Sequence, residues 1–454
     1  MVLNPFFAER LPRVAPDVPL GVIIDTPPSR LSQTLSALQT LGVVPADTVF
    51  SQFLLAMVPA GLIDQIAKIE GVTVHYNMPK TVLSQIPIPT PIADIIQNDP
   101  LLGPIRTDSI VIPGIKPFGA PPPPELVQPN IKIIPTGLSK AVILDIQTNL
   151  TGRGVLLAVI DTGTTPFHPQ LMSRNVILED VTGELPVDMM GHGMWCTTAA
   201  AGNPFNTRFG KCEGIATAAD ILHVKALSTS GMGTSFGIIK AMEVAFQRGA
   251  RVVSMSLGGD LQGSVFDDPE IKVVEGLSKL GMIFVIAAGN SGPSQYTIGS
   301  PGAAPSAITV GSFSITDAPS VAYFSSRGPQ GSYYMDHPDE LKSAEQVYGD
   351  DIHKPDVVAP GGGRADASAQ PDEVLYSGVT GWFDAFYDLL PDTFEGMHGT
   401  SQATPAVAGL IALLVEGGFV KSAADFKRVM AKHGHPKTDD DGYGLARLSF
   451  FSQL

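Results

Sequence analysis

Four polar residues stand where an apolar segment meets a turn, and their side chains suit nucleophilic catalysis. Asp161 follows the apolar run 155–160 in AVIDTG, His192 lies in GHG, Asn290 ends AAGN, and Ser401 opens an apolar helix in GTSQATPAVAG. A carboxylate can orient an imidazole, the imidazole can take a proton from a hydroxyl, and an amide can stabilise an oxyanion. Singly, they are typical of a turn Asp, a structural His, a turn Asn and an N-cap Ser. Together they favour a catalytic site.

The elements that must position these residues are apolar strands alternating with helices. Continuous apolar runs occupy 155–160, 221–226, 252–257 and 282–287, and a helical pattern covers 236–247. Such runs indicate strands that are buried on both faces. The sequence therefore predicts an α/β fold with a doubly wound, mostly parallel sheet and helices on both faces. The carboxyl ends of such strands meet at one edge of the sheet, which is where ligands bind.

The chain divides into three segments. Residues 1–79 contain a β-α-β-α-β pattern (strands 20–26, 53–58 and 72–76, helices 31–41 and 62–69), which predicts a small α+β domain. Residues 80–136 are rich in proline, which cannot build a strand ladder, and are interpreted as a linker open to cleavage or as an extended arm packed on the main domain. Residues 137–454 hold the expected catalytic domain.

Several motifs in the same order resemble one family. AVIDTG, GHG, AAGN and HGTSQATPAVAG resemble the Asp, His, Asn and Ser motifs of the subtilisin-like serine proteases, the subtilases, and the Asp–His–Ser order is that of subtilisin itself. SMSLGG at 254–259, KPDVVAPG at 354–361 and GYGLARL at 442–448 agree with this family. The resemblance covers residues 137–450 and implies a subtilisin-like fold. The residues themselves predict that Pro405 lies in the first turn of the helix that Ser401 opens.

The resemblance also implies the chemistry. Ser401 would attack a peptide carbonyl, His192 would accept its proton, and Asp161 would orient the imidazole. The Asn290 side chain and the Ser401 N–H would bind the oxyanion. No cofactor is needed for this reaction. Structural calcium, which many subtilases bind, has only unspecific candidates here in the acidic clusters 267–268 and 439–441.

Further residues are expected to bind an extended peptide or protein substrate. Gly231-Met232-Gly233 and Ser256-Leu257-Gly258 resemble the two strand edges that pair with it, and Ala288, Gly289 and Gly299 resemble the walls of the primary side-chain pocket. These segments carry no charge, which predicts a preference for large uncharged side chains. The segment 1–79 resembles the family's propeptide, which implies that the chain's own N-terminal domain is an intramolecular inhibitor.

Some residues depart from the family pattern or leave alternatives open. Met194-Trp195 stands where Thr-His is usual, and Gln402 stands where Met is common. His398 is a rival base, but it is too near Ser401 in sequence to reach it in line, so we interpret it as structural. Cys196 is interpreted as a small buried residue, although a free thiol there would make the enzyme sensitive to mercurials. Pairing with Cys212 stays open.

Composition limits the remaining alternatives. The 44 acidic and 29 basic residues among 454 give a net charge of −15, which argues against nucleic acid or an anionic membrane as partner. Neither a signal peptide nor a membrane span is expected, which leaves a cytoplasmic location or export by another route. Two other functions stay open: a non-catalytic binding protein with the same fold, and a subtilase that transfers its acyl group to an amine.

Overall fold

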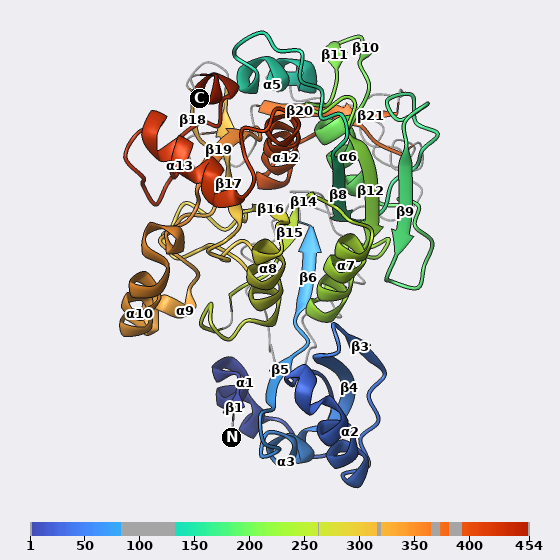
Figure 1. Cartoon of the computed structure of the whole chain (residues 1–454), viewed down its shortest axis with the longest axis vertical. Helices are drawn as coiled ribbons and strands as arrows, with labels where there is room; N and C mark the ends of the chain where they lie inside the picture. The colour runs from blue at the N-terminus through green and yellow to red at the C-terminus, as the bar shows by residue number, and fades with distance from the viewer. Residues whose placement is uncertain are drawn as a thin grey trace, which may run out of the picture.

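The molecule consists of two units that follow one another along its long axis (Figure 1). An eight-stranded sheet forms the centre of the larger unit. The computed structural model describes residues 2–82, 132–261, 263–315, 319–364, 373–380 and 393–452. The sheet is parallel except for its edge strand β18, and β19 also pairs with β17. In spatial order its strands are β18 (Ser320–Val321), β17 (Ile308–Ser314), β16 (Ile283–Ala287), β14 (Val252–Met255), β8 (Leu156–Asp161), β12 (Asp220–Lys225) and β9 (Val176–Asp180), with β19 (Val357–Pro360) beside β17.

Helices cover both faces of this sheet, because its central strands are apolar on both sides. Along β8, Leu157 and Val159 point into one core, and Ala158 and Ile160 point into another. The helices α6 (His192–Ala201) and α12 (Thr400–Glu416) pack in the first core, and α7 (Ser235–Gln247) and α8 (Pro269–Lys279) pack in the second. The period of two along the strand thus produces two apolar layers. The expected doubly wound α/β fold is confirmed.

Smaller elements complete this unit. They are α5 (Thr136–Ile143), the hairpin of β10 (Phe205–Thr207) and β11 (Gly210–Cys212), α9 (Tyr333–Asp336), α10 (Pro338–Tyr348), β20 (Glu373–Gly378), β21 (Phe394–Met397) and α13 (Ala423–His433). Among the described residues, every helix is too short or too polar to cross a membrane.

The smaller, N-terminal unit has its own sheet and its own core. Its five strands lie in the order β1 (Val2–Leu3), β5 (Thr73–Tyr76), β2 (Pro19–Asp25), β4 (Phe53–Pro59) and β3 (Asp47–Val49), with α1 (Pro5–Arg10), α2 (Leu31–Thr40) and α3 (Ile63–Ile66). Residues of this unit alone, among them Phe7, Val22, Leu38, Leu54 and Val74, form a separate apolar cluster. The expected strands and helices are all present, although the second helix is shorter than expected. The strands β1 and β3 and the helix α1 were not foreseen.

The segment expected to be unable to form a ladder does so at both of its ends. Residues 79–82 form β6 (Pro79–Val82), which pairs antiparallel with β13 (Met232–Thr234) on one side and with β15 (Leu257–Gly258) on the other. Residues 132–135 form β7 (Lys132–Pro135), parallel to β20. The expectation was wrong there because these ends, unlike the proline-rich middle, keep backbone N–H donors. The middle, residues 83–131, lies outside the described residues.

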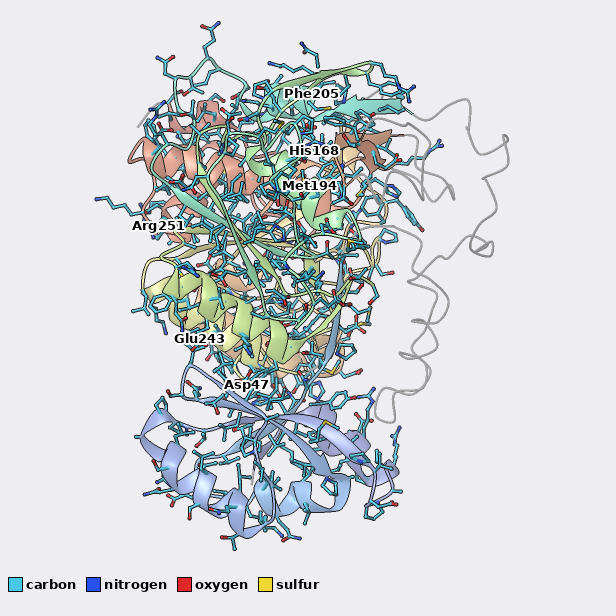
Figure 2. All side chains as sticks on the ribbon, turned by 90° about the vertical axis from the view of Figure 1, so that its right-hand side faces the viewer. Asp47, His168, Met194, Phe205, Glu243 and Arg251 are labelled. Carbon is cyan, nitrogen blue, oxygen red and sulfur yellow. The ribbon has the colours of Figure 1, made fainter. Side chains whose placement is uncertain are left out.

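Charged and polar contacts join the two units beyond β6. The Phe50 N–H donates to the carboxylate of Glu243 at 2.8 Å, and Lys240 pairs with Asp47. Asp25 pairs with Lys272 of α8 at 2.9 Å. Asp47 and Glu243 lie on facing elements of the two units in Figure 2. The N-terminal unit therefore docks on the helical face formed by α7 and α8.

Candidate active site

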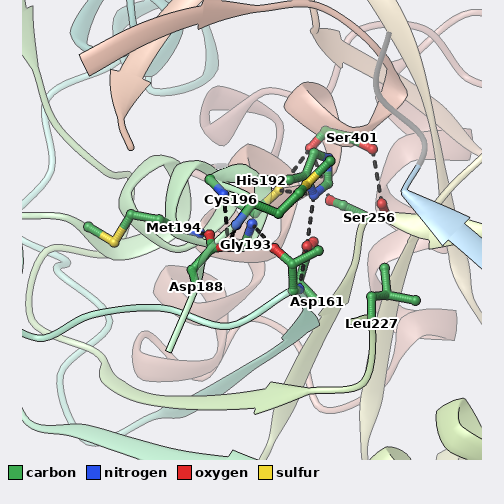
Figure 3. Close-up of polar contacts among 12 residues, drawn as sticks. Asp161, Asp188, His192, Gly193, Met194, Cys196, Leu227, Ser256 and Ser401 are labelled. Atoms are coloured by element: carbon green, nitrogen blue, oxygen red, sulfur yellow. Dashed lines mark hydrogen bonds and ion pairs between the residues drawn. The ribbon is translucent and has the colours of Figure 1, made fainter. Parts of the chain in front are cut away.

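Asp161 and His192 form a hydrogen bond that is completely shielded from solvent. Asp161 is the last residue of β8, and His192 is the first residue of α6. Its Nδ1 lies 2.8 Å from Asp161 Oδ1, and both side chains have 0 % exposure (Figure 3). The Thr162 N–H donates to the same carboxylate oxygen at 2.7 Å. Two donors thus fix the carboxylate, and the carboxylate fixes the plane of the imidazole.

Asp188 holds the start of α6 and was missed in the sequence. Its Oδ1 accepts hydrogen bonds from the N–H groups of Met190 and Gly191 at 2.8 Å, and its Oδ2 accepts one from Met194 N–H at 2.7 Å. Thr162 Oγ1 donates to Oδ1 at 3.0 Å, so the same carboxylate also joins α6 to the end of β8. Burial raises the pKa of Asp188, although these N–H groups oppose the rise. An Asp shortly before a Gly-His pair was the available signal.

Ser401 and Ser256 exchange two hydrogen bonds across the sheet edge. Ser401 Oγ donates to the carbonyl oxygen of Ser256 at 3.0 Å, and Ser256 Oγ donates to the carbonyl oxygen of Ser401 at 2.9 Å. The Ser401 carbonyl is open to this donor because Pro405, four residues later, has no N–H to give it. Pro405 lies inside α12, one turn beyond its expected place in the first turn.

The helices α6 and α12 lie against each other, but His192 and Ser401 are not joined by a hydrogen bond. Cys196 touches both, because its Sγ lies 3.8 Å from His192 Nδ1 and 3.7 Å from the Ser401 carbonyl oxygen. His192 Nε2 is buried and has no hydrogen-bond partner among the described residues. Ser401 Oγ is meanwhile held by Ser256. The imidazole nitrogen that could accept the Ser401 proton is therefore not engaged by any of these groups.

Asn290 lies at the same edge, three residues after the end of β16. Its Oδ1 accepts two hydrogen bonds from Thr400, one from the N–H and one from Oγ1, each 2.9 Å long. Thr400 directly precedes Ser401 at the start of α12, where the N–H groups of the first turn point outward. The amide nitrogen, on the same carbon as Oδ1, is the other hydrogen-bonding group of this side chain.

The two expected substrate edges lie on either side of β6. Met232 and Gly233 are paired with Thr81 and Lys80, and the Gly231 carbonyl accepts from Val82 N–H at 3.2 Å. On the other side, Leu257 and Gly258 are paired with Val82 and Thr81, and Ser256 comes directly before them. The structure thus brings both edges together around a segment of the chain's own N-terminal unit.

The residues expected to line the primary pocket are also brought together. Gly299 N–H donates to the Ala288 carbonyl at 3.2 Å, and Gly289 follows with a φ of +116°. A Cβ at Gly299 would lie 2.6 Å from the Gly259 carbonyl oxygen. At this position glycine is required by the close approach of two backbones.

Other residues singled out in the sequence have structural contacts. His398 packs on Phe324 with ring centres 5.4 Å apart, and burial lowers its pKa to about 4. Trp195 Nε1 donates to the Glu395 carbonyl at 3.2 Å, and Gln402 Nε2 lies 3.9 Å from Met397 Sδ.

Cys196 and Cys212 are buried thiols and form no disulfide. Burial raises the pKa of the Cys196 thiol well above its ordinary value. Cys196 is therefore a protonated, apolar neighbour of the histidine.

The acidic clusters considered for calcium are engaged in other contacts. Asp268 caps α8 by accepting from the N–H groups of Glu270 and Ile271. Asp440 pairs with Arg327 at 2.9 Å, and Asp441 pairs with His435 at 3.1 Å. Their contacts are those of helix caps and surface ion pairs. The ligand atoms of Asp161, His192 and Cys196 lie within 4.8 Å of one another, and the first two already bond each other.

Comparisons with known proteins agree with this architecture. The model of the subtilase family, Peptidase_S8, matches residues 152–444. Serine protease AprX of Bacillus subtilis is 33 % identical over 322 residues, which are 67 % of this chain and 66 % of AprX. Thermitase of Thermoactinomyces vulgaris is 29 % identical over 284 residues, 61 % of this chain and 79 % of its own. The chain belongs to the subtilase family.

Solved structures support the same fold. Fervidolysin from Fervidobacterium pennivorans, described as a keratinolytic enzyme related to subtilisin, has a TM-score of 0.65 at 17 % identity and covers 100 % of this chain and 63 % of its own. Sphericase has a TM-score of 0.52 at 26 % identity and covers 68 % of this chain and 97 % of its own. The chain spans 66 % of AprX and only 17 % of pyrolysin from Pyrococcus furiosus, so some relatives are much longer.

Proposed function

We propose that this chain is a serine endopeptidase made as a self-inhibited precursor. The observation that carries the proposal is the fully buried hydrogen bond between Asp161 and His192, on a helix that packs against the Ser401 helix and contacts the Ser401 carbonyl through Cys196. Family membership supports it, because named serine proteases are among the relatives. Ser401 is the nucleophile, His192 the general base, Asp161 its orienting carboxylate, and Asn290 an oxyanion donor.

The reaction begins with a rotation of the Ser401 side chain. Its Oγ leaves the Ser256 carbonyl and turns to His192 Nε2, which has an open lone pair when Nδ1–H is donated to Asp161. Oγ then attacks the substrate carbonyl carbon while its proton passes to Nε2. The carbonyl π electrons move to the oxygen, which becomes the oxyanion. Catalytic hydrogen bonds are often unformed before substrate binds, so the resting contact with Ser256 is compatible with this step.

The oxyanion is stabilised by donors that are already oriented. Two hydrogen bonds from Thr400 fix Asn290 Oδ1. The amide nitrogen of the same side chain is the first donor to the oxyanion. The Ser401 N–H, near the start of α12, is the second donor. Collapse of the intermediate breaks the C–N bond, and the leaving amine takes the proton from His192. Water then hydrolyses the acyl-enzyme by the same steps in reverse order.

The N-terminal unit inhibits by occupying the substrate groove. The strand β6 forms ladders with both edges, β13 and β15, and it ends beside Ser256, the partner of Ser401. An extended peptide held between two strand edges uses backbone hydrogen bonds that any sequence can make. A cut in the segment after Val82 would free this groove. We further propose that the uncharged residues Ala288, Gly289 and Gly299 accept a large uncharged side chain at the cleaved bond.

The test combines a covalent probe with a processing assay. A fluorophosphonate should label the wild-type protein after self-cleavage and should not label Ser401→Ala. N-terminal sequencing of the wild-type product should find a new terminus soon after Val82, whereas Ser401→Ala should stay intact. A wild-type protein that is folded, freed of its N-terminal unit and yet unlabelled would instead be a non-catalytic binding protein. Product masses in the presence of an added amine would reveal acyl transfer in place of hydrolysis.

A further inference from the structure

Lys80 of β6 is an almost completely buried lysine with two polar partners. Its side chain is 2 % exposed, and its Nζ lies 3.1 Å from Glu270 Oε1 and donates to the Ser300 carbonyl at 3.2 Å. Lysines are rarely buried to this degree unless they are paired with an anion. Both contacts cross from the N-terminal unit into the catalytic unit, because Glu270 and Ser300 belong to the latter.

The pocket is built for a long positively charged side chain. Glu270 lies in the first turn of α8 with 1 % exposure, and Lys80 is the cation paired with it, with the Ser235 side chain as a further hydrogen-bond neighbour. Its charge is therefore met by Lys80. Burial raises the pKa of Glu270, and the nearby lysine opposes this. Gly259 leaves room for the lysine stem, because a Cβ there would lie 3.3 Å from Lys80 Cδ.

The path of β6 makes this pocket part of the substrate groove. Lys80 is paired with Gly233, and the next two residues, Thr81 and Val82, are paired with Gly258 and Leu257. The backbones of β13 and β15 impose this register on any extended peptide that fills the same groove, and side chains alternate along it. A substrate bound in the place of β6 therefore puts one side chain where Lys80 now lies.

We propose that Glu270 and the Ser300 carbonyl form a specificity pocket that selects lysine or arginine at the substrate residue opposite Gly233. This inference rests on the proposed endopeptidase function and names the substrate class of that site. An ammonium or guanidinium replaces Lys80 after the N-terminal unit leaves. A neutral side chain leaves Glu270 unpaired, and an acidic one is repelled. The same pocket thus binds Lys80 of the N-terminal unit first and selects the substrate side chain after that unit has left.

The test uses self-processed enzyme and peptides with the sequence of residues 79–86, PKTVLSQI. Each carries a fluorophore and a quencher, and the lysine is kept or replaced by arginine, methionine or glutamate. We expect kcat/KM for the lysine and arginine peptides to exceed that for the methionine peptide by at least about tenfold, with the glutamate peptide slowest. Cleavage of all four peptides at similar rates would overturn the inference while leaving the endopeptidase function intact.

Variants of the enzyme locate the effect. In Glu270→Gln the preference for lysine over methionine should fall to near unity, whereas Asp339→Asn, which removes an exposed charge on α10, should keep it. Retention of the full lysine preference in Glu270→Gln would also overturn the inference. The peptide series on the unmodified enzyme decides the question even if Glu270→Gln does not fold. Failure to cleave any peptide together with absence of fluorophosphonate labelling would overturn the proposed function, and the inference with it.

Discussion

Thr400 donates two hydrogen bonds to the amide oxygen of Asn290, so the residue before the proposed nucleophile orients the proposed oxyanion donor. Both contacts are 2.9 Å long, and Thr400 Oγ1 also accepts from Gly289 N–H at 3.3 Å. The start of α12 and the end of β16 are therefore locked together. The two proposed oxyanion donors, Asn290 and the Ser401 N–H, cannot drift apart without breaking this contact.

Replacement of Asn290 by leucine should lower kcat by about 10²–10³, a magnitude taken from the corresponding donor in subtilisin itself. The reason is that the oxyanion exists only in the transition state, so KM should change little. Thr400→Val removes the hydroxyl donor but keeps the N–H, and it should cause a smaller loss in kcat. Steady-state kinetics on the PKTVLSQI peptide measure both. An Asn290→Leu enzyme with unchanged kcat would exclude this residue from the oxyanion site.

Removal of the Asp188 carboxylate should damage both stability and catalysis. Asp188→Ala leaves the N–H groups of Met190, Gly191 and Met194 without their acceptor, which should cost about 1–3 kcal/mol of unfolding free energy. It should also lower kcat, because His192 begins the helix that these groups anchor. Asp188→Asn keeps one acceptor oxygen, so its stability and its kcat should lie between those of the wild-type protein and Asp188→Ala. Urea denaturation in a Ser401→Ala background and kinetics in the active enzyme test the two effects separately.

Some of these residues could be predicted from the sequence and others could not. The apolar strands and the residues at their carboxyl ends, such as Asp161 and Asn290, were predictable because burial on both faces leaves a continuous apolar run. Asp188 was not, because a cap from an irregular loop carries no periodic pattern. The pairing of β6 could not be predicted, because the prolines that follow it indicated a linker in place of a strand. The contact of Lys80 with Glu270 joins residues far apart in sequence, and local pattern holds no information about such a pair.

The docking of the N-terminal unit should weaken in acid through Asp25. Burial alone would raise the pKa of this carboxyl, but His75 and Lys272 beside it prevail and hold the pKa well below its usual value of 3.8. A lowered carboxyl pKa stabilises the folded form above about pH 4, and this stabilisation is lost progressively as the pH falls further.

Asp25→Asn in a Ser401→Ala background measures this contribution. At pH 7 the variant should be less stable by about 1–3 kcal/mol, because a charged hydrogen-bonded pair is lost. The difference in stability between Asp25→Asn and the Ser401→Ala protein without it should shrink as the pH falls below about 4. Asp17→Asn, which changes an exposed carboxylate, should show no such difference. Urea midpoints from pH 7 to pH 3 provide the comparison, and a gap that is independent of pH would contradict the assignment.

Asp356 should be the most sensitive structural position outside the site. Its carboxylate is fully buried and lies 2.7 Å from Lys354 Nζ, 3.0 Å from Lys437 Nζ and 3.6 Å from Lys427 Nζ, and it accepts from Thr309 N–H at 2.9 Å. Burial lowers the pKa of Lys354 to about 7 even with this anion beside it, so the ammonium depends on Asp356 to stay charged.

Asp356→Ala leaves the buried Lys354 ammonium without its anion, whereas Lys427 keeps Asp351, and it should cost about 3–5 kcal/mol of unfolding free energy. Asp440→Asn, which breaks a pair between a largely buried Arg327 and an exposed carboxylate, should cost about 1 kcal/mol or less. Because Asp356 also anchors Thr309 of β17, which pairs with the strand leading to Asn290, its loss should slow fluorophosphonate labelling as well. Urea denaturation of both variants in a Ser401→Ala background gives the stabilities. Equal costs for the two substitutions would mean that water reaches Asp356 and that its lysines do not depend on it.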